Sequence, residues 1–225
     1  HFRRYELQTK LVMVTSLVLT VGGAALFFFL EHNRMNADMP LGEEVLVSFF
    51  SAVTPRMAGF NSVDTPALSS GSKLLTMVLM FVGGSPGSAA GGVKTTTIAV
   101  LAVCLISGIR GKRDPEVFGR RITNEDTRRA GIVVFMNLSL ALFGAMLLCV
   151  TQDFPLSDVL FESLSAMSTA GMSTGITREL NTFSQSVIIV LMFVGRVGSM
   201  SFAMSLLEQR AQALVRCPEE SVMIG

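Results

Sequence analysis

The sequence predicts an all-α membrane protein in which four transmembrane helices and two short re-entrant helices form two parallel repeats. Half of its 225 residues are hydrophobic and only 16% are charged, whereas a soluble domain carries about 25% charged residues. Its long apolar stretches match the thickness of a bilayer. The two halves of the chain are similar in sequence when one is shifted onto the other by a fixed number of residues. The net charge of +1 gives no indication of nucleic-acid binding.

The first apolar stretch, Leu11 to Leu30, contains no charged residue and is expected to cross the membrane. At about 1.5 Å per residue, its helix would be roughly 30 Å long, which is the thickness of the hydrocarbon core of a bilayer. The next apolar run, Val45 to Val53, is too short to cross and is predicted to re-enter the membrane. It leads into the glycine-containing segment Thr54 to Asn61.

The third apolar region, Lys73 to Ile109, is too long for one straight helix and is interrupted by a glycine-rich segment, residues 83–92. Glycines and Pro86 destabilise a helix, and lipid cannot hydrogen-bond the main-chain groups that the break frees. We therefore expect the break to face protein or water at membrane depth, as in transporters and pores. The segment looks like a phosphate-binding loop, but Val93 stands where that motif requires lysine, and no ATP site is predicted.

The second half of the chain repeats this order of elements. An apolar span, Ala130 to Val150, precedes a second short run, Val159 to Met167, which ends in the segment Ser168 to Gly175. A final span is predicted from Phe183 to Leu207.

Basic residues predict the orientation in the membrane, because they gather before the first span, between the two halves and after the last span. These residues are Arg3, Arg4, Lys10, Arg110, Lys112, Arg113, Arg120, Arg121, Arg128, Arg129, Arg210 and Arg216. The positive-inside rule therefore places both termini and the central loop in the cytoplasm. Both glycine-containing loops then enter from outside.

An internal repeat relates the two halves. A shift of 112 residues places Ala58-Gly59 on Ala170-Gly171, and it also places the segment Leu79 to Gly83 on the identical segment Leu191 to Gly195. Chance similarity of apolar sequences does not readily align both motifs in one register. Because each copy contains two spans, the copies have the same orientation and are parallel repeats. The predicted domains are residues 1–112 and 113–225.

The loops after the two short runs have the chemistry of a cation site. The C-terminal end of a helix carries a partial negative charge, which favours a cation. Glycine accepts backbone angles that a Cβ would forbid, so an extended strand can turn its carbonyl oxygens toward one axis. A ring of such carbonyls replaces the hydration shell of potassium. Since these segments carry few carboxylates, backbone ligation is predicted there.

Five segments of the chain form recognisable motifs: Thr54–Asn61, Gly84–Thr97, Ser168–Gly175, Phe193–Gly198 and Pro218–Gly225. They resemble the signatures of the Trk/Ktr/HKT superfamily of potassium transporters, and most closely those of the membrane subunit of Ktr-type potassium uptake systems. The resemblance covers essentially the whole chain. It implies four membrane–pore–membrane repeats around one pseudo-four-fold, potassium-channel-like pore, of which this chain would supply the third and fourth.

The same resemblance implies roles for particular residues. The selectivity filter, with backbone potassium ligation at Gly59 and Gly171, would comprise Met57, Ala58, Gly59, Phe60, Thr169, Ala170, Gly171 and Met172. The gating loop below it would comprise Gly83, Gly84, Ser85, Pro86, Gly87, Ser88, Ala89, Ala90, Gly91 and Gly92. Arg196 would face this loop, and a charge within an apolar span is usually functional. Met57 stands where threonine is expected, which matters little where carbonyls bind the ion.

Further expectations concern the ion and the partners. The transported ion would be potassium, with the involvement of sodium left open, and no organic cofactor is expected in this chain. Two filter strands cannot close a four-sided pore, so this chain alone is expected to be incomplete. It would need the first two repeats as a partner or a second copy of itself in their place, or it is a piece of a longer chain. The resemblance also implies a homodimer of complete pores in the plasma (inner) membrane and a cytoplasmic ring of nucleotide-binding regulatory subunits.

Two other classes of function remain open from the sequence. A secondary transporter of a small anionic or zwitterionic solute would use broken-helix ends as its site, although the duplicated Ala-Gly motif argues against it. A non-transporting scaffold that only completes a complex would tolerate loss of the loop glycines. An enzyme is the least favoured class, because the sequence offers no evident nucleophile–base pair or metal constellation.

Overall fold

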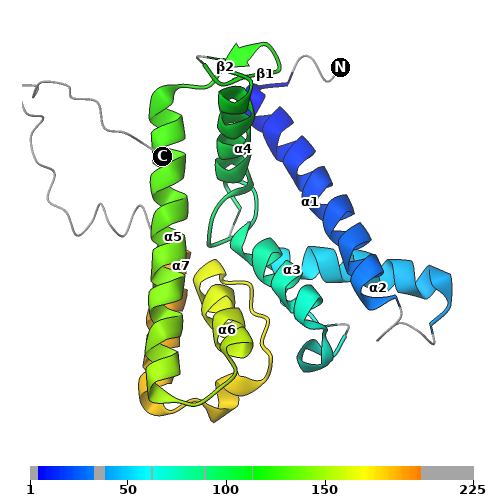
Figure 1. Cartoon of the computed structure of the whole chain (residues 1–225), viewed down its shortest axis with the longest axis vertical. Coiled ribbons are helices and arrows are strands. Elements are labelled where there is room, and N and C mark those ends of the chain that lie inside the picture. Colours follow the sequence, from blue (N-terminus) through cyan, green and yellow to red (C-terminus); the bar gives the residue numbers. More distant parts are fainter. Residues whose placement is uncertain (1–4, 33–38, 62, 89, 113, 199–225) are drawn as a thin grey trace, which may run out of the picture.

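The computed structural model describes residues 5–32, 39–61, 63–88, 90–112 and 114–198. Its helices are α1 (Leu7–Glu31), α2 (Leu41–Val53), α3 (Ser70–Phe81), α4 (Thr95–Ile109), α5 (Asn124–Thr151), α6 (Leu156–Ser168) and α7 (Thr182–Val197), and a small hairpin pairs β1 (Glu116–Val117) with β2 (Arg120–Arg121) (Figure 1). Three short 3-10 turns are Thr54–Arg56, Thr65–Ala67 and Ile176–Glu179. Outside the described residues lie Ala89 of the predicted gating loop, residues 199–207 of the predicted last span and the Pro218–Gly225 motif.

Two of the helices, α1 and α5, are long and apolar enough to cross a membrane. They contain 25 and 28 residues, which corresponds to about 37 and 42 Å of helix. Large apolar side chains project from them into the surroundings, with Phe29 78%, Phe135 73% and Val150 80% exposed. Contiguous apolar surface of this kind is unfavourable in water and suits lipid. The chain is therefore a mostly helical protein with the surface of a membrane protein.

The third apolar region consists of two helices, α3 and α4, with an excursion of the chain between them. Val82 and Val93 pair side by side in a parallel bridge at the base of this excursion. The Gly83 N–H donates to the Val93 carbonyl at 2.8 Å, and the Thr95 N–H donates to the Gly84 carbonyl at 3.1 Å. The chain thus leaves α3 and returns to start α4 at nearly the same place, with its freed main-chain groups paired within the protein.

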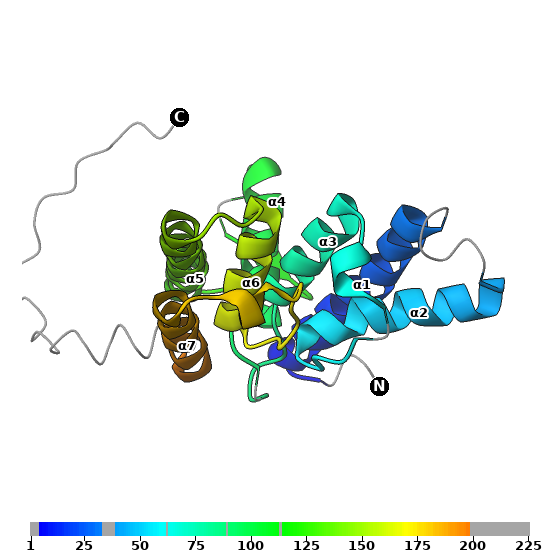
Figure 2. The same cartoon turned by 90° about the horizontal axis from the view of Figure 1, so that it is seen from below.

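The segments that follow α2 and α6 lie near the middle of the molecule. The two views show α5 and α7 side by side at one edge, α1 and α2 toward the other edge, and α3 and α6 between them (Figures 1 and 2). Met77 and Met80 of α3 pack against Phe161 of α6, and Ala170 and Met172 complete this buried cluster. A second cluster joins α5, α6 and α7. The first cluster connects the two halves of the chain.

The boundaries of several elements follow the 112-residue offset. The 3-10 turn after α2 ends at Arg56, and α6 ends at Ser168. The helices α3 and α7 begin at equivalent positions, after the N-cap residues Ser69 and Asn181. Each cap side chain accepts a hydrogen bond from an N–H three residues further on, at 3.2 and 2.8 Å. The two halves therefore build this part of the fold in the same way.

An ion pair also joins the halves. Lys73 near the start of α3 places its Nζ 3.1 Å from the Oδ1 of Asp158 near the start of α6, and the two side chains are only 14% and 17% exposed. Removing one member leaves the other charge partly buried without its partner, which is costly.

We expect a double-mutant cycle of Lys73→Met and Asp158→Asn to show coupling of about 1–2 kcal/mol, because the two charges stabilise each other in a partly buried site. The measurement is thermal unfolding of the purified protein in detergent. As a control, the exposed pair Arg129–Glu125 on α5 should couple by only about 0.3–0.5 kcal/mol. Strictly additive effects of the Lys73 and Asp158 substitutions would contradict the role of this pair.

Candidate functional site

Two short strands, residues 57–60 and 169–172, have the same unusual backbone. The turn after α2 ends at Met57 with φ 85°, and α6 ends at Thr169 with φ 56°. Two residues further on, Gly59 and Gly171 also have positive φ, at 68° and 83°. A left-handed conformation costs about 1–2 kcal/mol for a residue with a Cβ, so the surrounding structure must hold Met57 and Thr169 in place. Positive φ thus recurs at every second residue in both strands, at equivalent positions.

The amides of these strands are bound to the helices that precede them. The Ala58 and Gly59 N–H groups both donate to the Thr54 carbonyl, at 3.1 and 3.3 Å. In the second strand the Ala170 N–H donates to the Ser165 carbonyl at 3.0 Å. These three amide groups therefore face the helix ends that precede the strands.

The two strands lie directly against each other. A Cβ added to Gly59 would lie 2.9 Å from the Ala170 carbonyl oxygen and 3.7 Å from the Gly171 Cα. The Thr169 hydroxyl also donates to the Met57 sulfur at 3.6 Å. The structure therefore brings together the two glycine segments that the sequence predicts as filter strands.

The predicted gating loop packs against the end of α6. The Gly91 N–H donates to Thr169 Oγ1 at 3.1 Å. A Cβ on Gly91 would lie 2.7 Å from that oxygen and 2.9 Å from the Gly195 carbonyl oxygen, and a Cβ on Gly92 would lie 3.2 Å from the Ser168 Cα. At its tip, the segment Ser85 to Ser88 forms a turn with Gly87 at φ 82° and a hydrogen bond from the Ser88 N–H to the Ser85 carbonyl at 3.1 Å. Glycine is required where the loop meets its neighbours this closely.

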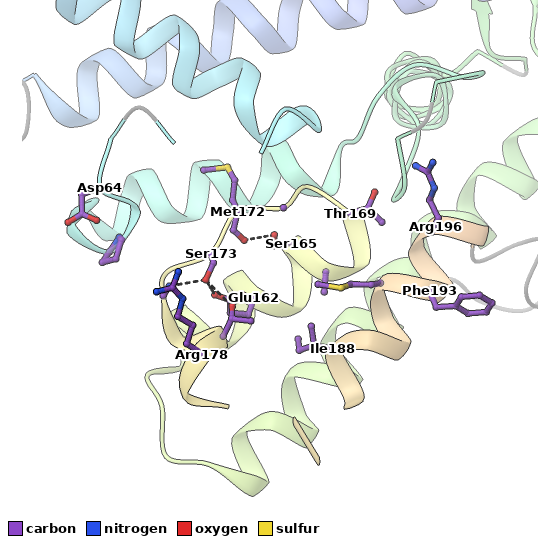
Figure 3. Close-up of a pocket in the computed structure, with 16 residues that line it drawn as sticks. Asp64, Glu162, Ser165, Thr169, Met172, Ser173, Arg178, Ile188, Phe193 and Arg196 are labelled. Carbon is purple, nitrogen blue, oxygen red and sulfur yellow. Dashed lines mark hydrogen bonds between the residues drawn. The ribbon is translucent and has the colours of Figure 1, made fainter. Parts of the chain in front are cut away.

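Arg196 lies in the same region as these strands. The preceding residue, Gly195, packs its backbone against the Met167 carbonyl of α6 so closely that a Cβ would overlap it. Arg196 lines a cavity of about 990 Å³ together with Thr169 and Gly171. Figure 3 shows its side chain near Thr169 at one end of this cavity, with Asp64 and Arg178 at the other end. The cavity thus extends from Arg196 past the second glycine strand.

The C-terminal end of the second strand, which is called its outer end below, is held by α6. Ser165 donates its hydroxyl to the Met172 carbonyl at 2.5 Å (Figure 3). The Met172 carbonyl is therefore turned toward α6, and ligands facing the centre would come from the residues before it. Phe60 of the first strand is 70% exposed, so its side chain lies at the surface of the described chain.

Arg56, which precedes the first strand, is fixed to α1. Its guanidinium donates to Thr20 Oγ1 at 2.9 Å, to Ser16 Oγ at 3.1 Å and to the Ser16 carbonyl at 3.3 Å. It lines a second cavity, of about 430 Å³, with Met57 and Gly84. The 112-residue offset places Met57 on Thr169 and Gly84 on Arg196, which line the larger cavity. The two cavities therefore lie at equivalent sides of the two strands.

Arg56, Ser165 and Glu162 are site residues that were not predicted from the sequence. Glu162 is only 4% exposed and binds the segment after the second strand. The available signal was the presence of a charge within or beside a short apolar run, as in the argument for Arg196. The hydroxyl of Ser165 gave no comparable signal, because serines are frequent throughout both short runs.

The fold and the site define a helical membrane protein whose two halves bring paired glycine strands and a broken helix together. The sequence matches the family described as TrkH, cation transport protein, over residues 4–212. The chain belongs to this family.

Curated relatives agree with this assignment. The chain is 38% identical to the potassium/sodium uptake protein NtpJ of Enterococcus hirae, over 99% of this chain and 51% of that protein. It is 34% identical to Ktr system potassium uptake protein B of Bacillus subtilis, over 100% of this chain and 51% of the relative, and 29% identical to the protein of the same name from Vibrio alginolyticus, over 100% and 50%. The chain thus spans about half the length of the curated relatives it matches.

We expect Gly59→Ala to destabilise the protein more than Gly171→Ala. Both glycines have positive φ, which costs about 1–2 kcal/mol for alanine, but only at Gly59 would the new methyl group also meet a main-chain oxygen, at 2.9 Å. The measurement is thermal unfolding in detergent. Gly22→Ala is the control, because its Cβ would meet nothing within 4 Å and alanine favours a helix over glycine by about 1 kcal/mol. Equal effects at Gly59 and Gly171 would contradict the close approach of the strands.

Proposed function

We propose that this chain forms half of a potassium-conducting pore and supplies the third and fourth of its four membrane–pore–membrane repeats, residues 1–112 and 113–225. In this arrangement α2 and α6 are re-entrant pore helices that enter from outside. Both termini and the central basic loop are cytoplasmic, in the plasma (inner) membrane. The function is potassium uptake.

The observation that carries this proposal is the pair of strands, residues 57–60 and 169–172, in which every second residue has positive φ. This backbone lets successive carbonyl oxygens turn toward the same side, and glycine adopts it without strain at Gly59 and Gly171. Carbonyl oxygens arranged around an axis replace the hydration shell of potassium. The two strands are in contact through Gly59 and Ala170, as neighbouring filter strands around one axis would be.

The ends of the two short helices favour a cation at the same place. The helices α2 and α6 lead into the strands by their C-terminal ends. A helix C-terminus carries about half a negative charge, so both helices contribute the electrostatic sign that attracts potassium. An anionic substrate would instead require helix N-termini at the site.

The glycine-rich loop, residues 83–92, and Arg196 are proposed as the gate. The loop binds Thr169 through the Gly91 N–H, directly before the second filter strand. Arg196 lines the cavity that also contains Thr169 and Gly171. A positive charge beside the ion path raises the energy of a passing cation, so movement of the loop and of Arg196 would control conduction.

The remaining parts of the assembly are also proposed. Two filter strands leave a four-sided pore open, and the relatives are about twice as long as this chain, so the first two repeats would cover the cavities beside Arg56 and Arg196. Complete pores would form a homodimer that binds a cytoplasmic ring of nucleotide-binding regulatory subunits. One relative is named a potassium/sodium uptake protein, so sodium belongs in any test of transport.

The test of this function is rubidium and sodium flux into liposomes that contain this chain joined to its first half. We expect rubidium to enter much faster than sodium. Gly59→Ser should reduce this preference by about tenfold or more, because a Cβ at this positive φ and close contact would displace the strand and its carbonyls. The loss of one well-placed ligand is worth roughly 1.4 kcal/mol. Equal entry of both ions, unchanged by the substitution, would contradict the potassium filter; the absence of flux from a folded complex would favour a scaffold.

The gating role of the loop makes a separate prediction. Gly91→Ala should push the loop away from Thr169, because its methyl group would lie 2.7 Å from the hydroxyl oxygen. Rubidium flux should therefore increase severalfold while the rubidium-to-sodium ratio stays constant. Gly108→Ala in α4, whose Cβ would meet nothing within 4 Å, is the control for flux. A change in the ion ratio without a change in flux would show that the loop acts on the filter and not as a gate.

A further inference from the structure

The carboxylate of Glu162 is an unexpected charge in the middle of α6. The side chain is only 4% exposed, within a short helix whose neighbouring residues Phe161 and Val159 are fully buried. A buried carboxylate is costly unless hydrogen-bond donors surround it. Polar groups at membrane depth are, for this reason, commonly tied to function.

Within the described residues, the hydrogen bonds that the Glu162 carboxylate accepts come from the segment that follows the second glycine strand. Its Oε1 accepts from the Ser173 hydroxyl and from the Thr174 N–H, the latter at 3.1 Å. Its Oε2 accepts from the Thr177 hydroxyl at 2.8 Å. Ser173 in turn bonds Thr177 at 2.9 Å and accepts from the Gly175 N–H at 2.9 Å. One carboxylate therefore closes residues 173–177 into a compact unit beside α6 (Figure 3).

The position of this unit fixes the outer end of the second strand. The strand starts at Thr169, directly after the end of α6, and runs back along the same helix. Ser165 holds the Met172 carbonyl, and Glu162, almost one helical turn earlier, holds the residues that follow. Ala170 and Gly171 lie between these two held positions, and the proposed pore would turn their carbonyls toward its axis. The directions of these carbonyls depend on both ends of the strand.

The first half of the chain lacks this carboxylate. The 112-residue offset places Phe50 opposite Glu162, and Phe50 is 39% exposed. The first strand is held instead at its N-terminal, inner end, where Arg56 forms hydrogen bonds to α1. The two equivalent strands are therefore fixed by different groups: a buried anion at the outer end of one and a cation at the inner end of the other.

We propose that Glu162 is a positioning residue for ion selection, which holds the outer end of the second strand so that the carbonyls of Ala170 and Gly171 fit potassium. This proposal rests on the proposed potassium pore. Glutamine keeps the shape of the side chain, but its amide group cannot accept all three hydrogen bonds. Loss of these charge-assisted bonds leaves the strand free to adapt to a smaller ion, and sodium then competes better.

The test compares Glu162→Gln with wild type in liposomes that contain the complete pore, with rubidium and sodium flux measured over a range of ion concentrations. We expect the rubidium preference to fall by about tenfold and the rubidium concentration for half-maximal flux to rise, as for the loss of charge-assisted hydrogen bonds. Glu162→Asp, which keeps the charge, should recover part of the preference. The matched control is Glu44→Gln, a second buried carboxylate that binds His32 at 2.7 Å near the start of α2, away from the strands.

The outcomes separate this inference from the proposed function. A selective wild-type pore with an unchanged ion ratio in Glu162→Gln would overturn the inference alone, whereas an unselective wild type would overturn the proposed filter. If Glu162→Gln does not fold, Thr177→Val and Ser173→Ala each remove one of the hydrogen bonds to the carboxylate, together with the bond between Ser173 and Thr177, and should lower the preference by a few-fold. No change in either of these variants would also overturn the inference, because it assigns the effect to the hydrogen bonds and not to the charge alone.

Discussion

The structure depends on the constraint that a chain reversing direction among apolar helices must pair its main-chain polar groups within the protein, because lipid offers no hydrogen bonds. The reversals after α2 and α6 begin at the left-handed residues Met57 and Thr169. The amides of these segments donate hydrogen bonds to the helix ends. In the broken segment between α3 and α4, the two ends of the excursion are hydrogen-bonded to each other. The Thr169 hydroxyl accepts from Gly91 and donates to the Met57 sulfur, so one side chain joins three reversing segments.

Close backbone contact explains why small residues occupy this region. Gly59 meets the Ala170 carbonyl, Gly91 meets Thr169 and the Gly195 carbonyl, and Gly195 meets the Met167 carbonyl. Apart from the contact of Gly91 with the Thr169 side chain, these contacts place one main chain against another, so a movement of one segment is transmitted to its neighbour through atoms that have no rotamers to absorb it. In the proposed pore, this arrangement places the gate and the second filter strand in direct contact, while the first strand is fixed separately through Arg56.

Much of this arrangement could be predicted from the sequence, because repetition and composition are local signals. The lengths of the apolar runs predicted the short helices and the interruption between α3 and α4, and the offset of Gly59 and Gly171 predicted which segments are equivalent. The side chains that hold the two strands in place were harder to predict from the sequence. Glu162 and Arg56 act through partners 11 to 15 and 36 to 40 residues away in the chain, and nothing in a single sequence predicts such partners. The ion pair of Lys73 with Asp158 connects residues 85 positions apart in the chain, and it could not be predicted for the same reason.

The proposed pore requires that the main-chain carbonyls of the two glycine strands bind potassium. The most direct measurement is anomalous X-ray scattering from rubidium in crystals of the complete pore, grown with rubidium in place of potassium. We expect rubidium on the pore axis, beside the carbonyls of the strands that contain Gly59 and Gly171. Rubidium bound at carboxylates elsewhere, with none beside these strands in a fully occupied crystal, would contradict it.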